Sequence, residues 1–178
     1  MARSVERETR ILDAAHALLL KQGWRGTSME AIAARAAIAK PTLYAYFPDK
    51  VAILAAITGR LRAEWRADFT AAIAGAEPLT ERIAAALAGW QKAIARLRGA
   101  SPHADDLLGD GSVPAAEMIA AIESALVAAG MAQPRLLAQI LVAASEGIGG
   151  AARSPAEIGP GVRLLTERML RGEDRRGG

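Results

Sequence analysis

The sequence predicts an all-α protein. Hydrophobic residues occupy 52% of its 178 positions, enough for a substantial core, whereas aromatic residues occupy only 4%. Alanine, the best helix former, is abundant, and runs of β-branched residues are scarce. Segments with apolar residues at helical spacing alternate with breaks that contain Gly or Pro. The length allows one large domain or a small domain joined to a larger one.

The first helix is expected at about residues 4–21. One buried stripe with i, i+4, i+7, i+8 spacing is formed by Ile11, Ala15, Leu18 and Leu19. Gly23 follows this stripe and is expected to end the helix as its C-terminal cap.

A short second helix is expected after Gly26. Thr27 or Ser28 can cap it, and Thr27 followed by Glu30 matches a capping box. Its inner face is expected to comprise Met29, Ile32, Ala33 and Ala36. A second short helix so soon after a cap indicates a compact helical head at the start of the chain.

The third helix is expected to begin near Lys40 and to end before Pro48. Pro41 falls in its first turn, where a missing N–H does no harm. Lys40, Thr42, Tyr44 and Tyr46 lie on its outer side, and Leu43 and Phe47 on its inner side. A short helix with basic, polar and aromatic groups on its free face suits a DNA major groove. This pattern predicts a helix-turn-helix.

Later helices are read from the same signals. Asp49 is expected to cap a fourth helix with Ile53, Ile57, Leu61, Trp65 and Phe69 on its inner side. Residues 99–113 are rich in helix breakers and are expected to form a connection with one helical turn at 103–108. The remaining helices are expected at about 50–74, 78–98, 114–129, 134–149 and 161–171, before a frayed tail at 172–178.

The basic excess falls within the first fifty residues. They hold eight Lys and Arg against five Asp and Glu, a net charge of +3, whereas the other 128 residues carry 14 of each sign. A positive head agrees with an anionic partner such as DNA, although a solvated surface would give a similar asymmetry.

The head resembles the TetR family of bacterial regulators. The resemblance rests on Thr27-Ser-Met-x-x-Ile-Ala, Arg35-Ala-x-Ile and Thr42-Leu-Tyr-x-Tyr-Phe-x-x-Lys50, and it covers roughly residues 8–55. It implies an N-terminal three-helix DNA-binding domain at 1–50 and a larger helical ligand-binding and dimerisation domain at 51–178. Two positions depart from the family pattern: Ala37 replaces a turn glycine, and Ala39 replaces a serine cap.

The resemblance implies roles for single residues of the head. Lys40, Pro41 and Tyr44 are expected at base edges, and Ser28, Thr42, Tyr46 and Lys50 at phosphates. The chemistry agrees, since Lys donates to guanine, apolar groups press on thymine methyls, and hydroxyls bind phosphate. Further contacts along the DNA backbone are expected from Arg3, Arg7 and Arg10.

The rest of the chain is expected to form a homodimer and to hold a small apolar or aromatic effector. A symmetric pair reads a palindromic double-stranded operator. The predicted dimer stripe comprises Leu137, Ile140, Leu141, Ala144, Ile148, Val162, Leu165 and Met169, unless these face only their own core. The predicted pocket lining comprises Trp65, Phe69, Trp90, Leu107, Leu108, Met118 and Ile122, each of which also suits plain packing.

Other classes of protein have less support. An enzyme lacks a nucleophile–base set, because there is no Cys and the two His are far apart in sequence. No cofactor is expected: 147–152 echoes a dinucleotide loop without its strand or helix. No metal site is expected at His103, Asp105 and Asp106. No stretch resembles a membrane span or a signal peptide, so a cytoplasmic protein is expected. A helical adaptor that binds a protein partner stays an alternative to a ligand-released repressor.

Overall fold

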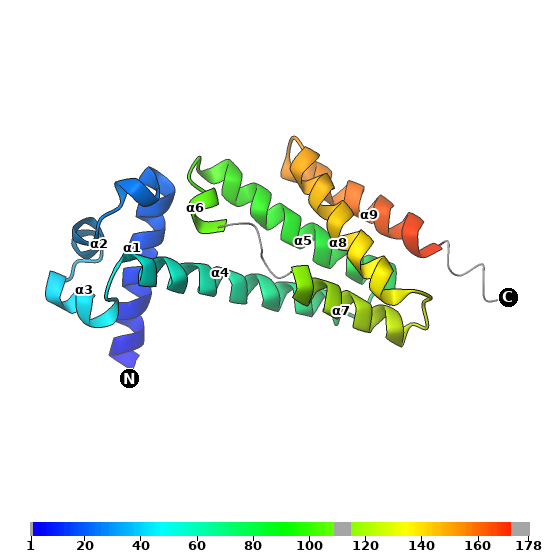
Figure 1. The fold of residues 1–178 in the computed structure, drawn as a ribbon, viewed down its shortest axis with the longest axis horizontal. Helices are drawn as coiled ribbons and strands as arrows, with labels where there is room; N and C mark the ends of the chain where they lie inside the picture. The colour runs from blue at the N-terminus through cyan, green and yellow to red at the C-terminus, as the bar shows by residue number, and fades with distance from the viewer. Residues whose placement is uncertain (1, 109–114, 172–178) are drawn as a thin grey trace. The chain divides into compact units, whose positions relative to one another are not determined.

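The computed structural model describes residues 2–108 and 115–171, with side chains from residue 4. Over those residues it is all-helical (Figure 1), which confirms the predicted fold class. No helix in this part of the chain is long and apolar enough to cross a membrane. The helices are α1 (Ala2–Gly26), α2 (Met29–Arg35), α3 (Lys40–Tyr46), α4 (Lys50–Ile73), α5 (Leu79–Ala100), α6 (Asp105–Leu108), α7 (Ala115–Ala128), α8 (Pro134–Ala151) and α9 (Pro155–Arg171).

The described residues form two compact units. Unit 1 comprises residues 2–63 and 97–108, and unit 2 comprises residues 64–96 and 115–171. The sequence placed the division at residue 50. The structure places it further along α4, because Ile53 and Ile57 are fully buried in the core of unit 1. Two long helices, α4 and α5, therefore each contribute residues to both units.

The end of α1 shows how the first turn of unit 1 is built. Gly23 adopts φ 73°, a left-handed conformation that glycine tolerates, and interrupts the helix where the sequence predicted its end. The Thr27 hydroxyl donates to the Gly23 carbonyl at 2.8 Å and is buried. Ser28 caps α2, since its Oγ accepts from the Ala31 N–H at 3.1 Å. Thr27 thus closes the turn before α2 and forms no capping box with Glu30.

The turn between α2 and α3 carries both departures from the family pattern. Ala37 adopts φ 53°, so an alanine occupies a left-handed position that favours glycine. Ala39 caps α3 without a side-chain hydrogen bond, and Pro41 lies in the first turn as expected. Despite these two losses α3 spans Lys40–Tyr46, because Leu43 and Phe47 are buried in the core of unit 1.

The segment after α5 packs against the end of α1 within unit 1. Ser101 donates to the Leu20 carbonyl at 2.5 Å, and the Trp24 N–H donates to Asp106 Oδ2 at 2.7 Å. Leu107 of α6 lies buried in the same core as Ile11 and Leu19. The expected helical turn at 103–108 is therefore present and joins a distant segment of sequence to α1.

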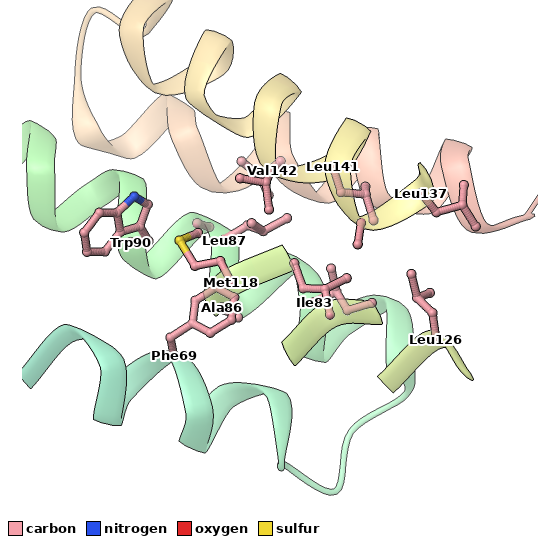
Figure 2. Packing of buried hydrophobic residues seen from close by; sticks show 14 of the residues in the cluster. Phe69, Ile83, Ala86, Leu87, Trp90, Met118, Leu126, Leu137, Leu141 and Val142 are labelled. Carbon is pink, nitrogen blue, oxygen red and sulfur yellow. The ribbon is translucent and has the colours of Figure 1, made fainter. Parts of the chain in front are cut away.

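Unit 2 is held together by apolar side chains from several helices. Figure 2 shows residues of α4, α5, α7 and α8 meeting in one core, with Leu87 and Leu141 among the fully buried members. Gly149 of α8 lies where a side chain would collide with the Gln91 amide of α5. Of the glycines at 147–152, Gly149 permits a close approach as expected, whereas a Cβ at Gly147 or Gly150 would meet nothing within 4 Å.

The helix boundaries mostly agree with the sequence, with one clear exception. Asp49 caps α4 through the Ala52 N–H at 2.8 Å, and Gly130 ends α7 with φ 71°. The last helix, predicted from residue 161, begins at Pro155 instead. Proline suits a first helical position, and Pro160 follows within the first two turns, so neither stops the helix. Pro114 and the predicted tail at 172–178 lie outside the described residues.

Candidate nucleic-acid interface and effector cavity

The exposed face of α3 carries the three side chains predicted to reach bases. Lys40, Pro41 and Tyr44 are exposed, and Tyr44 keeps 48% of its surface accessible. Leu43 and Phe47 anchor the opposite face in the core. Because residues four apart share a helix face, Lys40 and Tyr44 lie beside each other along α3. This face combines a cation, an aromatic ring and a rigid apolar ring, which are groups that can contact base edges.

Three of the predicted phosphate ligands differ in their surroundings. Ser28 is exposed at the start of α2, where its Oγ accepts the helix-capping hydrogen bond. Thr42 is half-buried on α3. Tyr46 is half-buried, with its hydroxyl 3.3 Å from Ser4 Oγ of α1. Hydroxyls and a helix N-terminus are ordinary phosphate ligands.

Lys50 lies in a position that its sequence did not indicate. Its Nζ donates to the Trp24 carbonyl at 2.6 Å and to the Thr27 carbonyl at 2.8 Å. The ammonium also lies 4.2 Å from the centroid of the Trp24 ring, within cation–π range. Lys50 thus connects the start of α4 to the turn before α2. Phosphate binding by Lys50 stays a prediction, to which the structure adds this internal role.

An ion pair that sequence reasoning missed lies at the start of α3. Lys40 Nζ is 3.1 Å from Glu30 Oε1, and both side chains are more than half exposed. A hydrogen bond from its own backbone N–H, and then the Lys40 ammonium, hold the pKa of Glu30 below its usual value. No local spacing rule predicts a pair ten residues apart, since the α2–α3 turn brings the two together.

The acidic groups near α6 have protein partners. Asp106 accepts from Trp24, and Asp105 Oδ1 lies 3.1 Å from Arg98 Nε. Both carboxylates therefore serve helix ends and ion pairing within unit 1. Within residues 2–108 and 115–171, no cluster of three His, Cys, Asp or Glu side chains suits a metal ion.

Two hollows of unit 2 share an aromatic pair in their walls. Trp65 and Trp90 pack edge to face with centroids 4.8 Å apart, and together with Phe69 they line both hollows. The larger, of about 310 Å³, is bounded by α4 and α5. The smaller, of about 140 Å³, also takes Met118 of α7 and is bordered by the Arg66–Glu117 ion pair. Four predicted pocket residues therefore gather here.

The other predicted pocket residues lie elsewhere. Leu107 and Leu108 belong to α6 in unit 1, and Leu107 packs in the core of that unit. Ile122 is fully buried in the core of unit 2 and lines neither of the two hollows. Apolar residues at helical spacing look alike in sequence whether they line a cavity or fill a core, which explains these errors.

The predicted dimer stripe divides into buried and accessible residues. Leu137, Leu141 and Val162 are buried in the core of their own unit, so they are not available to a second subunit. Ala144, Ile148, Leu165 and Met169 are half-buried. Ile140 is exposed, and Leu136 and Leu164 are large exposed apolar residues that the sequence prediction left out. The predicted helices stay candidates for dimerisation. Their accessible face, however, is displaced by about one residue from the predicted stripe.

The model of the bacterial regulatory proteins of the tetR family matches residues 11–57. This region holds the α2–α3 turn and the exposed face of α3. Residues 11–57 therefore form a TetR-family domain. The TetR-family match includes Glu30, Lys40, Tyr44 and Lys50 but excludes the hollows of unit 2.

Curated TetR-family relatives match the first part of the chain. The HTH-type transcriptional repressor KstR of Mycobacterium tuberculosis (strain ATCC 25618 / H37Rv) is 45% identical over 75 residues, which are 41% of this chain and 34% of that protein. The KstR of Rhodococcus jostii (strain RHA1) is 49% identical over 55 residues, 31% of this chain and 26% of that protein. The matched part thus spans 34% and 26% of the length of these two relatives.

Solved TetR-family structures match nearly the whole chain. A TetR-like transcriptional regulator from Rhodococcus sp. RHA1 has a TM-score of 0.65 at 26% identity, covering 93% of this chain and 96% of that one. A TetR/AcrR-family regulator from Thermobifida fusca YX-ER1 has a TM-score of 0.69 at 25% identity, covering 90% and 96%. The similarity in fold therefore continues beyond residue 57, where the match to the family model ends.

Proposed function

We propose that this protein is a DNA-binding transcriptional repressor that works without catalysis. The observation that carries the proposal is the outer face of α3, where Lys40, Pro41 and Tyr44 are exposed while Leu43 and Phe47 hold the helix in the core. A helix presented in this way fits a major groove. The match to the tetR family model, which spans this helix, supports the same role.

The contacts are assigned by chemistry. Lys40 donates to guanine, and Pro41 and Tyr44 press on thymine methyls. Ser28, Thr42 and Tyr46 bind phosphates, and Lys50 holds the turn that carries Ser28. Arg7 and Arg10, exposed on α1, extend the positive surface. The side chain of Arg3 lies outside the described residues.

The protein acts as a homodimer on a palindromic operator. One α3 helix covers few base pairs, and a two-fold axis doubles the site that is read. Three large apolar side chains on the free faces of α8 and α9 support pairing: Leu136, Ile140 and Leu164. Exposed apolar groups near Gly147, which has open space around it, allow helices of a second copy to approach closely.

A small apolar or aromatic effector releases the operator. The hollow beside Met118 supports this class, because its walls are Trp65, Phe69, Trp90 and Met118. The Arg66 and Glu117 charges at its border satisfy each other through two hydrogen bonds of 2.6 and 3.1 Å, so they do not call for a charged ligand. An effector shifts the population toward a form with low DNA affinity only as far as its affinities for the two forms differ.

A selection from a random duplex pool at low salt tests the proposal. We expect one enriched site with two inverted half-sites about one helical turn apart. Light scattering at micromolar concentration should then give twice the monomer mass. Absence of any preference among duplexes would reject the repressor and leave the helical adaptor. A monomer bound to a single half-site would reject the dimer alone.

A further inference from the structure

The start of α3 holds a carboxylate that base reading does not itself require. Glu30 of α2 lies 3.1 Å from Lys40, the first residue of α3. Both side chains are more than half exposed, and a surface ion pair of this kind adds little stability. A negative charge at a surface meant for polyanionic DNA also lowers affinity for every duplex. If Glu30 contributes to DNA binding, it therefore does so by changing which DNA groups the Lys40 ammonium contacts.

Lys40 has more freedom than the other groups on this face. Its flexible stem can turn the ammonium toward a phosphate as easily as toward a base, and phosphate contacts carry no sequence information. Lys40 also stands at a helix N-terminus, where the helix dipole disfavours a cation, and Ala39 supplies no side-chain cap there. Without a local partner, no interaction would hold this ammonium at the start of α3.

Glu30 supplies that partner. An ammonium has three N–H donors, and one directed to Glu30 leaves two, which match the O6 and N7 acceptors of guanine. The carboxylate also repels phosphate oxygens near the pair, whereas a neutral base edge meets no such repulsion. Its own backbone N–H, and then the Lys40 ammonium, lower the pKa of Glu30, so the carboxylate stays charged beside Lys40.

We propose that Glu30 is a specificity-determining residue that holds Lys40 toward base edges and keeps it from phosphates. This inference rests on the proposed DNA-binding function. Glu30 lowers non-specific affinity and in return raises the ratio of specific to non-specific binding. It is a positioning residue, since it acts through Lys40 and not by touching DNA.

Salt titrations on the full-length protein test this role. On random duplex, log K against log salt should steepen by about 0.9 in Glu30→Gln, because Lys40 is released to one more phosphate. The double variant Glu30→Gln/Lys40→Ala should have a salt slope equal to that of the wild type or flatter. Glu77→Gln removes the same charge from an exposed site between α4 and α5 and serves as the matched control. Thermal melts check that each variant is folded.

Binding-site selection gives the second measurement. Glu30→Gln should lose preference at one base pair per half-site, and its ratio of specific to non-specific affinity should fall about tenfold. If the slope and the selected site of Glu30→Gln equal those of Glu77→Gln, the role of Glu30 is wrong while the repressor stands. If wild-type protein selects no site at all, the proposed function falls and the inference falls with it.

Discussion

The α2–α3 head and the core of unit 2 are built by different means. In the head, single residues at defined positions set the geometry. Gly23, Thr27 and Ser28 shape the turn before α2, and Lys50 hydrogen-bonds to it. In unit 2, many interchangeable apolar side chains share the work, as the cluster around Leu87 and Leu141 shows. The head therefore has a sequence that can be recognised over a short stretch, whereas unit 2 is recognised mainly by its fold. The following variants test this contrast.

The largest effect is expected from Leu43→Ala. Leu43 is fully buried beneath α3, and its loss leaves a cavity worth about 3 kcal/mol in a small core. We expect DNA binding to disappear while helical content in unit 2 persists. Hydrogen exchange by mass spectrometry should show faster exchange in α1–α3 and little change in α7–α9. Equal loss of protection in both units would mean that they unfold together and would weaken the contrast.

A comparable but smaller loss is expected from Gly149→Val in unit 2. The added side chain meets the Gln91 amide, so either the buried Gln91 side chain must leave its bond to Ser145 or α8 must shift on α5, at a cost of about 2 kcal/mol. Gly147→Ala is the control, because nothing lies within 4 Å of a Cβ there. Denaturant titration measures both. If Gly149→Val is as stable as the control, the close approach of α5 and α8 is not needed.

Lys50→Ala separates two roles for one residue. Loss of two hydrogen bonds from a half-buried ammonium should lower stability by about 1.5 kcal/mol and weaken DNA binding through the turn that holds Ser28. The salt slope on random duplex should change by less than about half a unit. A slope flatter by about one unit, with stability unchanged, would show instead that Lys50 grips a phosphate.

The smallest effect, and a favourable one, is expected from Ala39→Ser. The serine supplies the side-chain cap that α3 lacks and should stabilise the protein by about 1 kcal/mol. Ala39→Val supplies no hydroxyl and is the control. Thermal unfolding is the measurement, and a melting temperature no higher than that of the wild type would mean that the backbone at Ala39 does not permit the cap.

Sequence reasoning succeeded where local rules act. The exposed Tyr44, the buried Phe47 and the cap at Asp49 all follow from spacing and backbone chemistry. The strained Ala37 also appears where the resemblance placed a glycine. These predictions depend on neighbours within one or two helical turns, so the local sequence is sufficient to make them.

Sequence reasoning failed where distant segments meet. The residues around Lys50 do not indicate its hydrogen bond to the Trp24 carbonyl. Those around Glu30 do not indicate its ion pair with Lys40. Burial on α8 and α9 depends on which neighbouring helix covers which side, so Leu141 was assigned to a partner subunit while Leu136 was overlooked. Leu107, expected in the effector pocket, lies instead in the core of unit 1, because α6 packs on α1. Periodicity identifies an apolar face but does not identify what covers it.

The uncapped start of α3 has a thermodynamic consequence. A seven-residue helix entered through a left-handed alanine has little intrinsic stability, so its first turn frays more readily than a capped one. A duplex that engages this turn also orders it, and association then includes a small folding step. Calorimetry would register that step as a more negative heat capacity change than the buried surface alone predicts, and as an operator affinity that declines faster on warming.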